Sequence, residues 1–266
     1  MLYTDQLNRK IELLSVPRRV ISLVPSQTEL LYDLGLRDEV VGITKFCIHP
    51  DAWFRTKTRV GGTKKYDLEK IKALQPDLII GNKEENEQEQ IELLMKDHNV
   101  WMSDIYTLKD ALNMIVALGA VLGKNEAATN IKLQIEFAFH RLQVQYPTSN
   151  IQHPAKVAYF IWNKPYMVAG HDTFINEMLK YCGFENVFTD RDSRYPGISS
   201  EELIAANPQL VLLSSEPYPF KEQHVAELQQ LLPAAKILIV DGELFSWYGS
   251  RLLKAPDYFV DLLKQV

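Results

Sequence analysis

The sequence predicts an α/β fold of two related lobes, each with a mostly parallel sheet, joined by a single long bridging helix. Three observations lead to this prediction. Short apolar segments, typical of buried strands, alternate with segments of helical periodicity in both halves of the chain. One central segment, residues 123–146, keeps helical spacing with no Gly or Pro after its first residue. The two halves also repeat a pattern in which a glutamate precedes a proline by seven residues.

The first half alternates strands and helices, as a parallel sheet with crossover helices requires. We expect strands at 10–14, 20–24, 40–44, 78–80 and 100–103. We expect a first helix that is capped by Ser26 or Thr28 and ends at Leu34, and a second helix at 67–75 with Asp67 as its cap. Two further helices are expected at 84–97 and 108–122. Residues 45–66 are predicted to form a loop.

The central segment is expected to be one helix with Asn125 as its N-cap. About 20 helical residues at ~1.5 Å each span roughly 30 Å, about the width of a small domain. Its apolar residues form two stripes, which predicts contacts on two sides. The first stripe contains Ile131, Ile135, Ala138 and Leu142, and the second contains Leu133, Phe137 and Val144.

The second half repeats the alternation, with strands expected at 157–162, 210–214 and 237–240 and helices at 173–181, 200–206, 220–231 and the C-terminus. Glu69 precedes Pro76 by seven residues, and Glu201 precedes Pro208 by the same interval. We interpret this as two related lobes at 1–122 and 148–266 with a bridging helix at 123–147. Chance similarity between ordinary α/β units is the alternative.

Composition restricts the function. The chain has 266 residues and a net charge of −5, without a long basic run, so we do not expect a nucleic-acid partner. No apolar run reaches the roughly 18 residues of a membrane span. The start lacks the features of an export signal. Two cysteines argue against a disulfide framework, although one bond stays possible.

Common enzyme motifs are missing from the sequence. It contains no dinucleotide-binding or phosphate-binding glycine motif, no nucleophile elbow and no H-E-x-x-H. This favours a protein without catalysis but does not eliminate an enzyme.

Aromatic residues gather where connections leave the expected strands. In open α/β sheets, ligands bind outside the carboxyl ends of the strands, so two such edges facing each other would form a cleft for a large, flat or macrocyclic ligand. His171 is a further candidate contact in this cleft. The alternative is that the aromatic side chains pack within their own loops and that His171 pairs with Asp172. The aromatic candidates are Phe46, Trp53, Tyr66, Trp162, Tyr166, Tyr195, Tyr218, Trp247 and Tyr248.

Cys47 and His49 are separated by one residue and are candidate ligands for a soft metal ion. Two ligands do not complete a metal site, and a buried cysteine next to a loop histidine explains the pair equally well. The remaining histidines, His98, His140, His153 and His224, are predicted to lie on the surface.

Glu69 and Glu201 each fall in the first turn of an expected helix, at equivalent places in the two lobes. A carboxylate there complements the helix dipole, and Ser199 with Glu202 predicts a capping box. These local roles do not account for the symmetry of the pair, which suits two basic residues on a two-fold partner.

Four segments together resemble one family: RVISLVPSQTELLYDLGL, VGGTKKYDLEKIKALQPDLIIG, YMVAGHDTFINEMLKYCGFENV and YPGISSEELIAANPQLVLLS. They are similar to substrate-binding proteins of ABC importers in the cobalamin, haem and ferric-siderophore group, and most similar to the cobalamin-binding ones. The resemblance implies a rigid bridging helix and little closure on binding. It implies that Tyr195 contacts a corrinoid and that Glu69 and Glu201 dock onto permease arginines. Thr63 stands where an aromatic contact is expected.

We therefore expect a binding protein that captures a metal chelate in the inter-lobe cleft and delivers it to an ABC permease dimer. The ligand would be cobalamin or another corrinoid, haem or a ferric siderophore, with no required cofactor and a monomeric state. The resemblance implies a periplasmic or cell-surface location, and because the sequence shows no export signal, the cytoplasm is the alternative. The alternatives are a soluble cytoplasmic corrinoid or haem carrier and a metal-dependent enzyme with Cys47, His49 and His171 as ligands.

Overall fold

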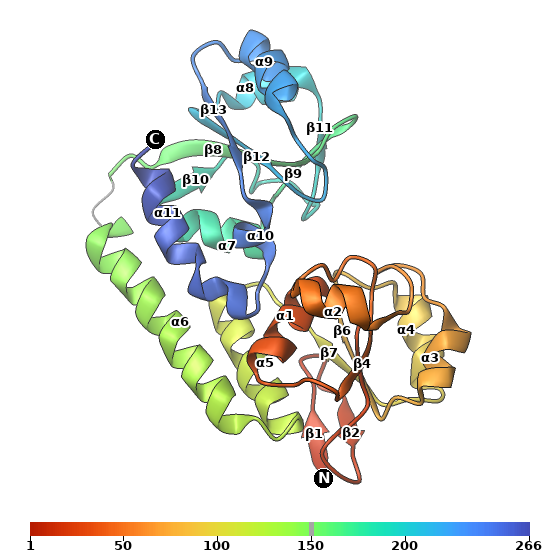
Figure 1. Cartoon of the computed structure of the whole chain (residues 1–266). Coiled ribbons are helices and arrows are strands. Elements are labelled where there is room, and N and C mark those ends of the chain that lie inside the picture. The colour runs from red at the N-terminus through yellow and green to blue at the C-terminus, as the bar shows by residue number, and fades with distance from the viewer. Residues whose placement is uncertain (149–151) are drawn as a thin grey trace. The chain divides into compact units, whose positions relative to one another are not determined.

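The computed structural model describes residues 1–148 and 152–266, and the predicted α/β fold with a bridging helix is confirmed (Figure 1). The chain divides into two compact units. The first contains Met1–Ile105, Lys109–Ile135 and Tyr248–Arg251, and the second contains Tyr106–Leu108, Glu136–Trp247 and Leu252–Val266. This division falls within the long helix, whereas the sequence-based boundaries treat that helix as a separate segment.

The first unit is built on a five-stranded sheet in the order β5-β4-β3-β6-β7. Every neighbouring pair in it is parallel. β3 and β6 are entirely buried, which explains the apolar residues at their starts, Val20–Ile21 and Leu78–Ile80. The strands are β3 (Val20–Ser22), β4 (Val40–Ile43), β5 (Thr58–Arg59), β6 (Leu78–Asn82) and β7 (Val100–Ser103).

Apart from α2, the helices of the first unit agree with the predictions in place but not in every boundary. Asp67 caps α3 as predicted, because its side chain accepts a hydrogen bond from Lys70 N. The predicted cap at Ser26 or Thr28 is wrong, since α1 has Val24 as N-cap, with no side-chain cap bond, and begins at Pro25. The helices are α1 (Pro25–Asp33), α2 (Asp51–Thr56), α3 (Leu68–Leu74), α4 (Gln88–Met95) and α5 (Leu108–Val121).

Two further boundaries differ from the predictions. The expected loop at 45–66 contains α2 and β5, and β5 pairs with β4 to extend the sheet. The helix predicted to start at Glu84 begins only at Gln88. Asn82 explains the delay, because its side-chain oxygen accepts hydrogen bonds from Glu84 N and Glu85 N and holds a turn after β6.

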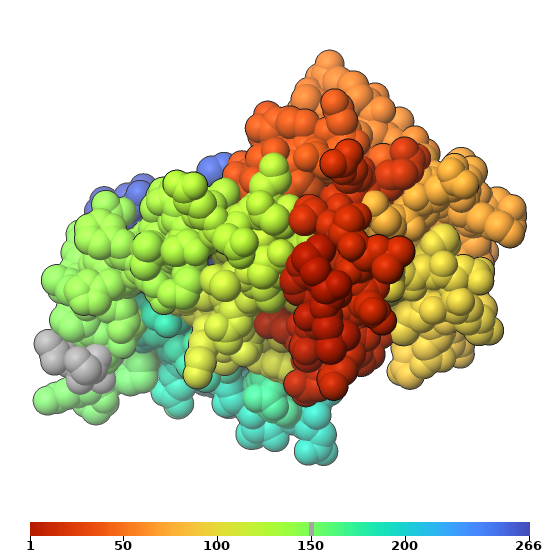
Figure 2. Space-filling model, turned by 90° about the horizontal axis from the view of Figure 1, so that it is seen from below, coloured from red at the N-terminus to blue at the C-terminus, as the bar shows by residue number. Residues whose placement is uncertain are grey.

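An antiparallel hairpin of β1 (Leu2–Thr4) and β2 (Lys10–Glu12) precedes this sheet. Figure 2 shows it in red, beside the yellow-green surface of α5. Gln6, in the turn of the hairpin, connects it to β7 and to α5. Its backbone N–H donates to Met102 O in β7 at 3.1 Å, and its side chain donates to Asp110 O in α5 at 2.9 Å. The N-terminal segment is therefore part of the first unit.

The second unit contains a six-stranded mixed sheet in the order β11-β9-β8-β12-β13, with β10 also paired to β8. β8, β10, β12 and β13 are parallel, whereas β9 and β11 are antiparallel neighbours. The sequence predicted only three of these strands. They are β8 (Ala155–Trp162), β9 (Tyr166–Val168), β10 (Phe184–Asn186), β11 (Gly197–Ile198), β12 (Leu210–Ser214) and β13 (Lys236–Val240).

Within residues 152–266, five α-helices and the 3-10 helix η2 follow α6. Thr173 caps α7, and Ser199 with Glu202 forms the predicted capping box of α8. The short helix α10 was not predicted. The elements are α7 (Phe174–Tyr181), α8 (Ser200–Ala206), α9 (Glu222–Leu231), α10 (Gly242–Ser246), η2 (Ser250–Leu253) and α11 (Ala255–Leu263).

The repeated sequence pattern corresponds to a repeated structure. α3 and α8 have seven residues each and end in left-handed residues, Gln75 and Asn207, directly before a proline. In each repeat, the side chain of the residue after this proline accepts a hydrogen bond from the backbone at the start of the central strand, β3 or β8. Asp77 accepts from Arg19 N at 3.0 Å, and Gln209 accepts from Lys156 N at 3.0 Å. The similarity therefore reaches individual hydrogen bonds.

The long helix α6 (Asn125–Gln145) is continuous and starts at the residue predicted as its N-cap (Figure 1). The first predicted stripe faces the protein interior, with Ile135 and Leu142 almost fully buried. The second stripe was expected to make contacts, and this prediction is wrong. Leu133, Phe137 and Val144 are 56%, 69% and 68% exposed, respectively.

None of the helices in the described part of the chain is long and apolar enough to cross a membrane. Cys47 and Cys182 are both buried free thiols.

Candidate functional site

The carboxyl ends of the first sheet carry a buried polar network. Ser103 Oγ accepts from Gln27 Nε2 at 2.6 Å and from Asn82 Nδ2 at 2.9 Å. Asn86 Oδ1 accepts from Asn82 N at 2.8 Å, and Asn86 Nδ2 donates to Thr63 O at 3.0 Å. Buried polar groups that all have hydrogen-bond partners make the region that they connect rigid. The loops at this edge of the sheet are therefore held by a rigid hydrogen-bonded network. We did not predict this network, although polar residues directly after apolar strand residues are a signal for it.

Cys47 belongs to the same buried region. Its Sγ lies 3.0 Å from Thr28 Oγ1 and 3.1 Å from Thr44 Oγ1. Burial raises the pKa of the Cys47 thiol, whereas metal ligation requires the thiolate. Within residues 1–148 and 152–266, no group of three or more His, Cys, Asp or Glu side chains is placed to hold a metal ion. Cys47 and the partly exposed His49 thus acquire no third ligand there.

The three aromatic candidates of the first unit have different environments. Trp53 is buried and packs edge-on against Tyr32, with ring centroids 5.3 Å apart. Tyr66 is also buried, and its hydroxyl donates to Thr63 O at 2.7 Å. Phe46 is 50% exposed in the connection after β4. Of these three side chains, Phe46 is the exposed one.

In the second unit, Trp162 ends β8 and is 41% exposed. Its ring packs edge-on against Tyr218 at 5.6 Å. The Tyr218 hydroxyl lies 3.3 Å from Asn163 Nδ2 and 3.1 Å from His224 Nε2. The prediction that His224 lies on the surface is wrong, because it is 5% exposed beneath Tyr218. These contacts hold the exposed indole of Trp162 in a defined orientation.

Trp247 follows α10 in the same unit and is buried. Its indole Nε1 donates to Glu216 Oε1 at 2.8 Å, and Ser246 Oγ donates to the same oxygen at 3.1 Å. Burial raises the pKa of Glu216, and the nearby carboxylates of Glu243 and Asp241 act in the same direction. Tyr248 is also buried but belongs to the first unit.

His171 and Tyr195 come from two connections that are joined by backbone contacts. Gly170 N donates to Arg194 O at 2.8 Å. A side chain at position 170 would meet Ser193 O at 2.9 Å, so glycine permits this approach. His171 Nε2 lies 3.6 Å from Asp172 Oδ2, as the alternative interpretation expected. Tyr166, on β9, is partly buried and packs edge-on against Phe160 of the core of the second unit.

Glu69 and Glu201 are exposed in the first turns of α3 and α8. A hydrogen bond from the Ser199 side chain lowers the pKa of Glu201. Both glutamates therefore occupy equivalent, solvent-facing places in the repeated substructure.

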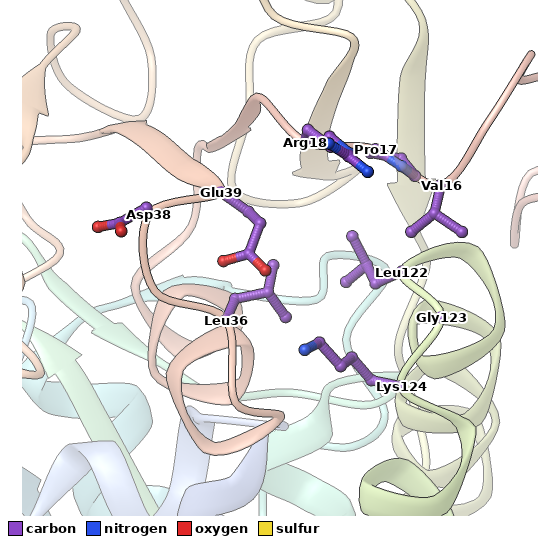
Figure 3. A pocket seen from close by; sticks show the side chains of 9 residues that line it. All are labelled: Val16, Pro17, Arg18, Leu36, Asp38, Glu39, Leu122, Gly123 and Lys124. Atoms are coloured by element: carbon purple, nitrogen blue, oxygen red, sulfur yellow. The ribbon is translucent and has the colours of Figure 1, made fainter.

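A hollow of about 560 Å³ lies at the opposite, amino-terminal edge of the first sheet. Figure 3 shows the side chains of Glu39 and Lys124 directed toward the same space as Leu36 and Leu122. A hydrogen bond from the Arg37 backbone is the main cause that lowers the pKa of Glu39, and Lys124 contributes. Because ligands of open α/β sheets bind at the carboxyl ends of strands, we assign no ligand to this hollow.

Two related α/β units, a continuous helix shared between them and exposed aromatic side chains after the strands define a two-lobed binding protein of the bridging-helix class. Comparison with known families identifies the particular group. The chain belongs to the periplasmic binding protein family, whose model matches residues 20–236.

Relatives and solved structures agree with this assignment. The chain is 27% identical over 244 residues to the vitamin B12-binding protein of Pectobacterium carotovorum subsp. carotovorum, covering 91% of this chain and 86% of the relative. The periplasmic vitamin B12-binding protein BtuF of Vibrio cholerae shares the fold with a TM-score of 0.79 and 24% identity, covering 93% and 97% of the two chains. A periplasmic haem-binding protein from Pseudomonas aeruginosa shares the fold with a TM-score of 0.79 and 23% identity, covering 94% of this chain and 92% of that one. All three of these proteins are named as binding proteins.

Proposed function

We propose that this protein is the substrate-binding component of an ABC importer that captures a metal chelate, with a corrinoid as the first candidate ligand, and delivers it to a permease. The observation that carries this proposal is the similarity to vitamin B12-binding proteins over nearly the whole chain. The proposed place of action is the periplasm or the cell surface.

Two exposed aromatic side chains support the ligand part of the proposal. Phe46 and Trp162 follow or end strands of the two sheets and keep large parts of their rings accessible. Such rings stack on flat or macrocyclic ligands and bury much apolar area at a small entropic cost. Tyr195 and His171 are partly exposed and remain proposed contacts. Trp53, Tyr66 and Tyr166 support the structure around them, so we assign them no direct contact.

Glu69 and Glu201 support the permease part of the proposal. Each carboxylate is exposed, and each occupies the same position of a repeated helix. A two-fold permease presents two equivalent surfaces, and arginine recognises a carboxylate through paired, charge-assisted hydrogen bonds. We therefore propose that each glutamate meets one arginine of a permease dimer.

Calorimetric titration with cyanocobalamin, haemin and a ferric siderophore tests the ligand part. We expect saturable binding of one of these chelates at one site per chain, with cyanocobalamin first. If none of the three binds, the proposed ligand class is wrong. A ligand that binds but is not passed to a permease in vesicles would favour a soluble carrier instead.

A further inference from the structure

The connections after β4 and β5 carry an unusual concentration of positive charge. Residues 45–65 contain six Lys or Arg side chains and one Asp, whereas the whole chain has a net charge of −5. Four of these cations have partners within the first unit: Arg55 with Asp51, Lys57 with Arg37 O, Arg59 with Phe54 O, and Lys64 with Glu87. Among the described residues, Lys45 and Lys65 have no acidic partner. Two ammonium groups are therefore left to bind an anion.

Both lysines lie on backbone that is held in place. Lys45 N donates to Gly61 O at 2.8 Å, and Gly62 N donates to Lys65 O at 2.9 Å, so the two connections are tied together. Tyr66 and Asn86 both donate to Thr63 O and fix the turn between them. The anchor points of the two lysines are thus set before any ligand arrives.

Lys45 also lies next to an accessible aromatic ring. Its Nζ is 5.0 Å from the centre of the Phe46 ring. Gly62 lies beneath both side chains, since a Cβ there would be 3.4 Å from Phe46 Cε2 and 3.6 Å from Lys45 Cε. An aromatic ring and a cation are therefore adjacent at Gly62, and Lys65 follows on backbone bonded to the same glycine. We refer to Lys45, Phe46, Gly62 and Lys65 together as one small surface.

We propose that this surface is a subsite for an anionic oxygen group at the rim of the bound chelate, with the Phe46 ring against the adjoining apolar part. This inference rests on the proposed function and specifies the ligand chemistry of the first unit. A phosphodiester, as in the nucleotide loop of cobalamin, and a carboxylate, as in the propionates of haem, both present such oxygens. Lysine binds either as a point charge, without a fixed hydrogen-bond geometry.

Two pairs of ligands separate the sources of the anion. Cyanocobalamin carries the phosphodiester, and dicyanocobinamide lacks it. Haemin carries two carboxylates, and haemin dimethyl ester does not. We expect the protein to bind the anionic member of one pair about tenfold more tightly than its partner, and this preference should weaken as salt is raised.

The variant Lys45→Gln/Lys65→Gln should lose most of that preference while still binding the neutral member as the unchanged protein does. Lys10→Gln, an exposed lysine on β2, is the control and should keep the preference. If the unchanged protein binds a chelate but shows no preference for the anionic member in either pair, or if the double variant keeps the preference, the subsite is refuted while the proposed function stands. If no member of either pair binds, the ligand class and the subsite are both wrong.

Discussion

Arg251 forms a bidentate ion pair with Glu29, with Nε and Nη2 each 2.8 Å from one carboxylate oxygen. The two side chains are only 10% and 12% exposed. Glu29 lies in α1, and Arg251 lies 222 residues later in a segment that belongs to the first unit. Gly249 permits the approach, because a Cβ there would lie 2.5 Å from Ser26 O. The pair thus attaches a late part of the chain to an early helix.

Replacing Arg251 should destabilise the protein strongly. Loss of either partner leaves the charge of the other one buried and uncompensated, which costs about 3 kcal/mol in the free energy of unfolding. Arg251→Ala and Glu29→Ala can be compared by denaturant titration. Arg141→Ala is the matched control, since the Arg141–Asp257 pair is exposed and should contribute under about 1 kcal/mol. Similar losses from both arginine variants would contradict the expectation.

Glu216 should make stability fall as pH rises. Its pKa is raised above the ordinary 4.5, so the folded state holds the proton more tightly than the unfolded state does. Its contribution is present below about pH 4.5 and is lost as pH rises through the higher, folded value. Glu216→Gln keeps an oxygen for Trp247 and removes the titration. Relative to the unchanged protein, this variant should gain stability as pH rises from about 4 to 7.

Denaturant titrations of both proteins across this range measure the difference. A difference that stays constant across this pH range would show that the Glu216 carboxyl does not titrate in this way.

Replacing Glu69 and Glu201 should impair delivery of the ligand to the permease without affecting folding or ligand binding. Because both carboxylates are exposed, Glu69→Ala/Glu201→Ala should leave folding and ligand affinity nearly unchanged. Uptake by a permease in vesicles should fall by at least about tenfold if each acid meets an arginine. The control is Glu89→Ala/Glu222→Ala, which removes exposed first-turn glutamates from α4 and α9. Equal uptake with both double variants would remove the support for docking.

The exposed rings should contribute directly to ligand affinity. Trp162→Ala, Phe46→Ala and Tyr195→Ala should each weaken binding by about 1–3 kcal/mol, because stacking area and ring contacts are lost. Phe137→Ala is the control, since this ring is 69% exposed on α6, away from the strand ends. Calorimetry on the chelate that the protein binds measures all four. Unchanged affinity in the three test variants would exclude these side chains from the site.

Local features determined much of the fold. Asp67 and Ser199 cap their helices through their own side chains, and Gln75 and Asn207 end them directly before a proline. Each of these interactions joins residues a few positions apart, so a sequence pattern is sufficient to predict it. The two-lobed fold, the central helix and the family followed from such patterns and their order.

Other features depend on residues that are far apart in the sequence. Trp53 and Phe46 are both aromatic residues in the same connection, but only the first packs on α1 and is buried. Burial of His224 depends on Tyr218 and on the Asn163 amide 3.3 Å from that hydroxyl. The second stripe of α6 has the same spacing as a buried one and is nevertheless exposed.

The sequence by itself therefore determined the class of fold, the repeat and the equivalence of Glu69 with Glu201. Tertiary structure alone decided which rings are accessible, which lysines have no acidic partner and where Tyr248–Arg251 belongs. The physical reason is that helix caps and strand periodicity depend on neighbouring residues, whereas burial and charge pairing depend on whatever the folded chain places nearby.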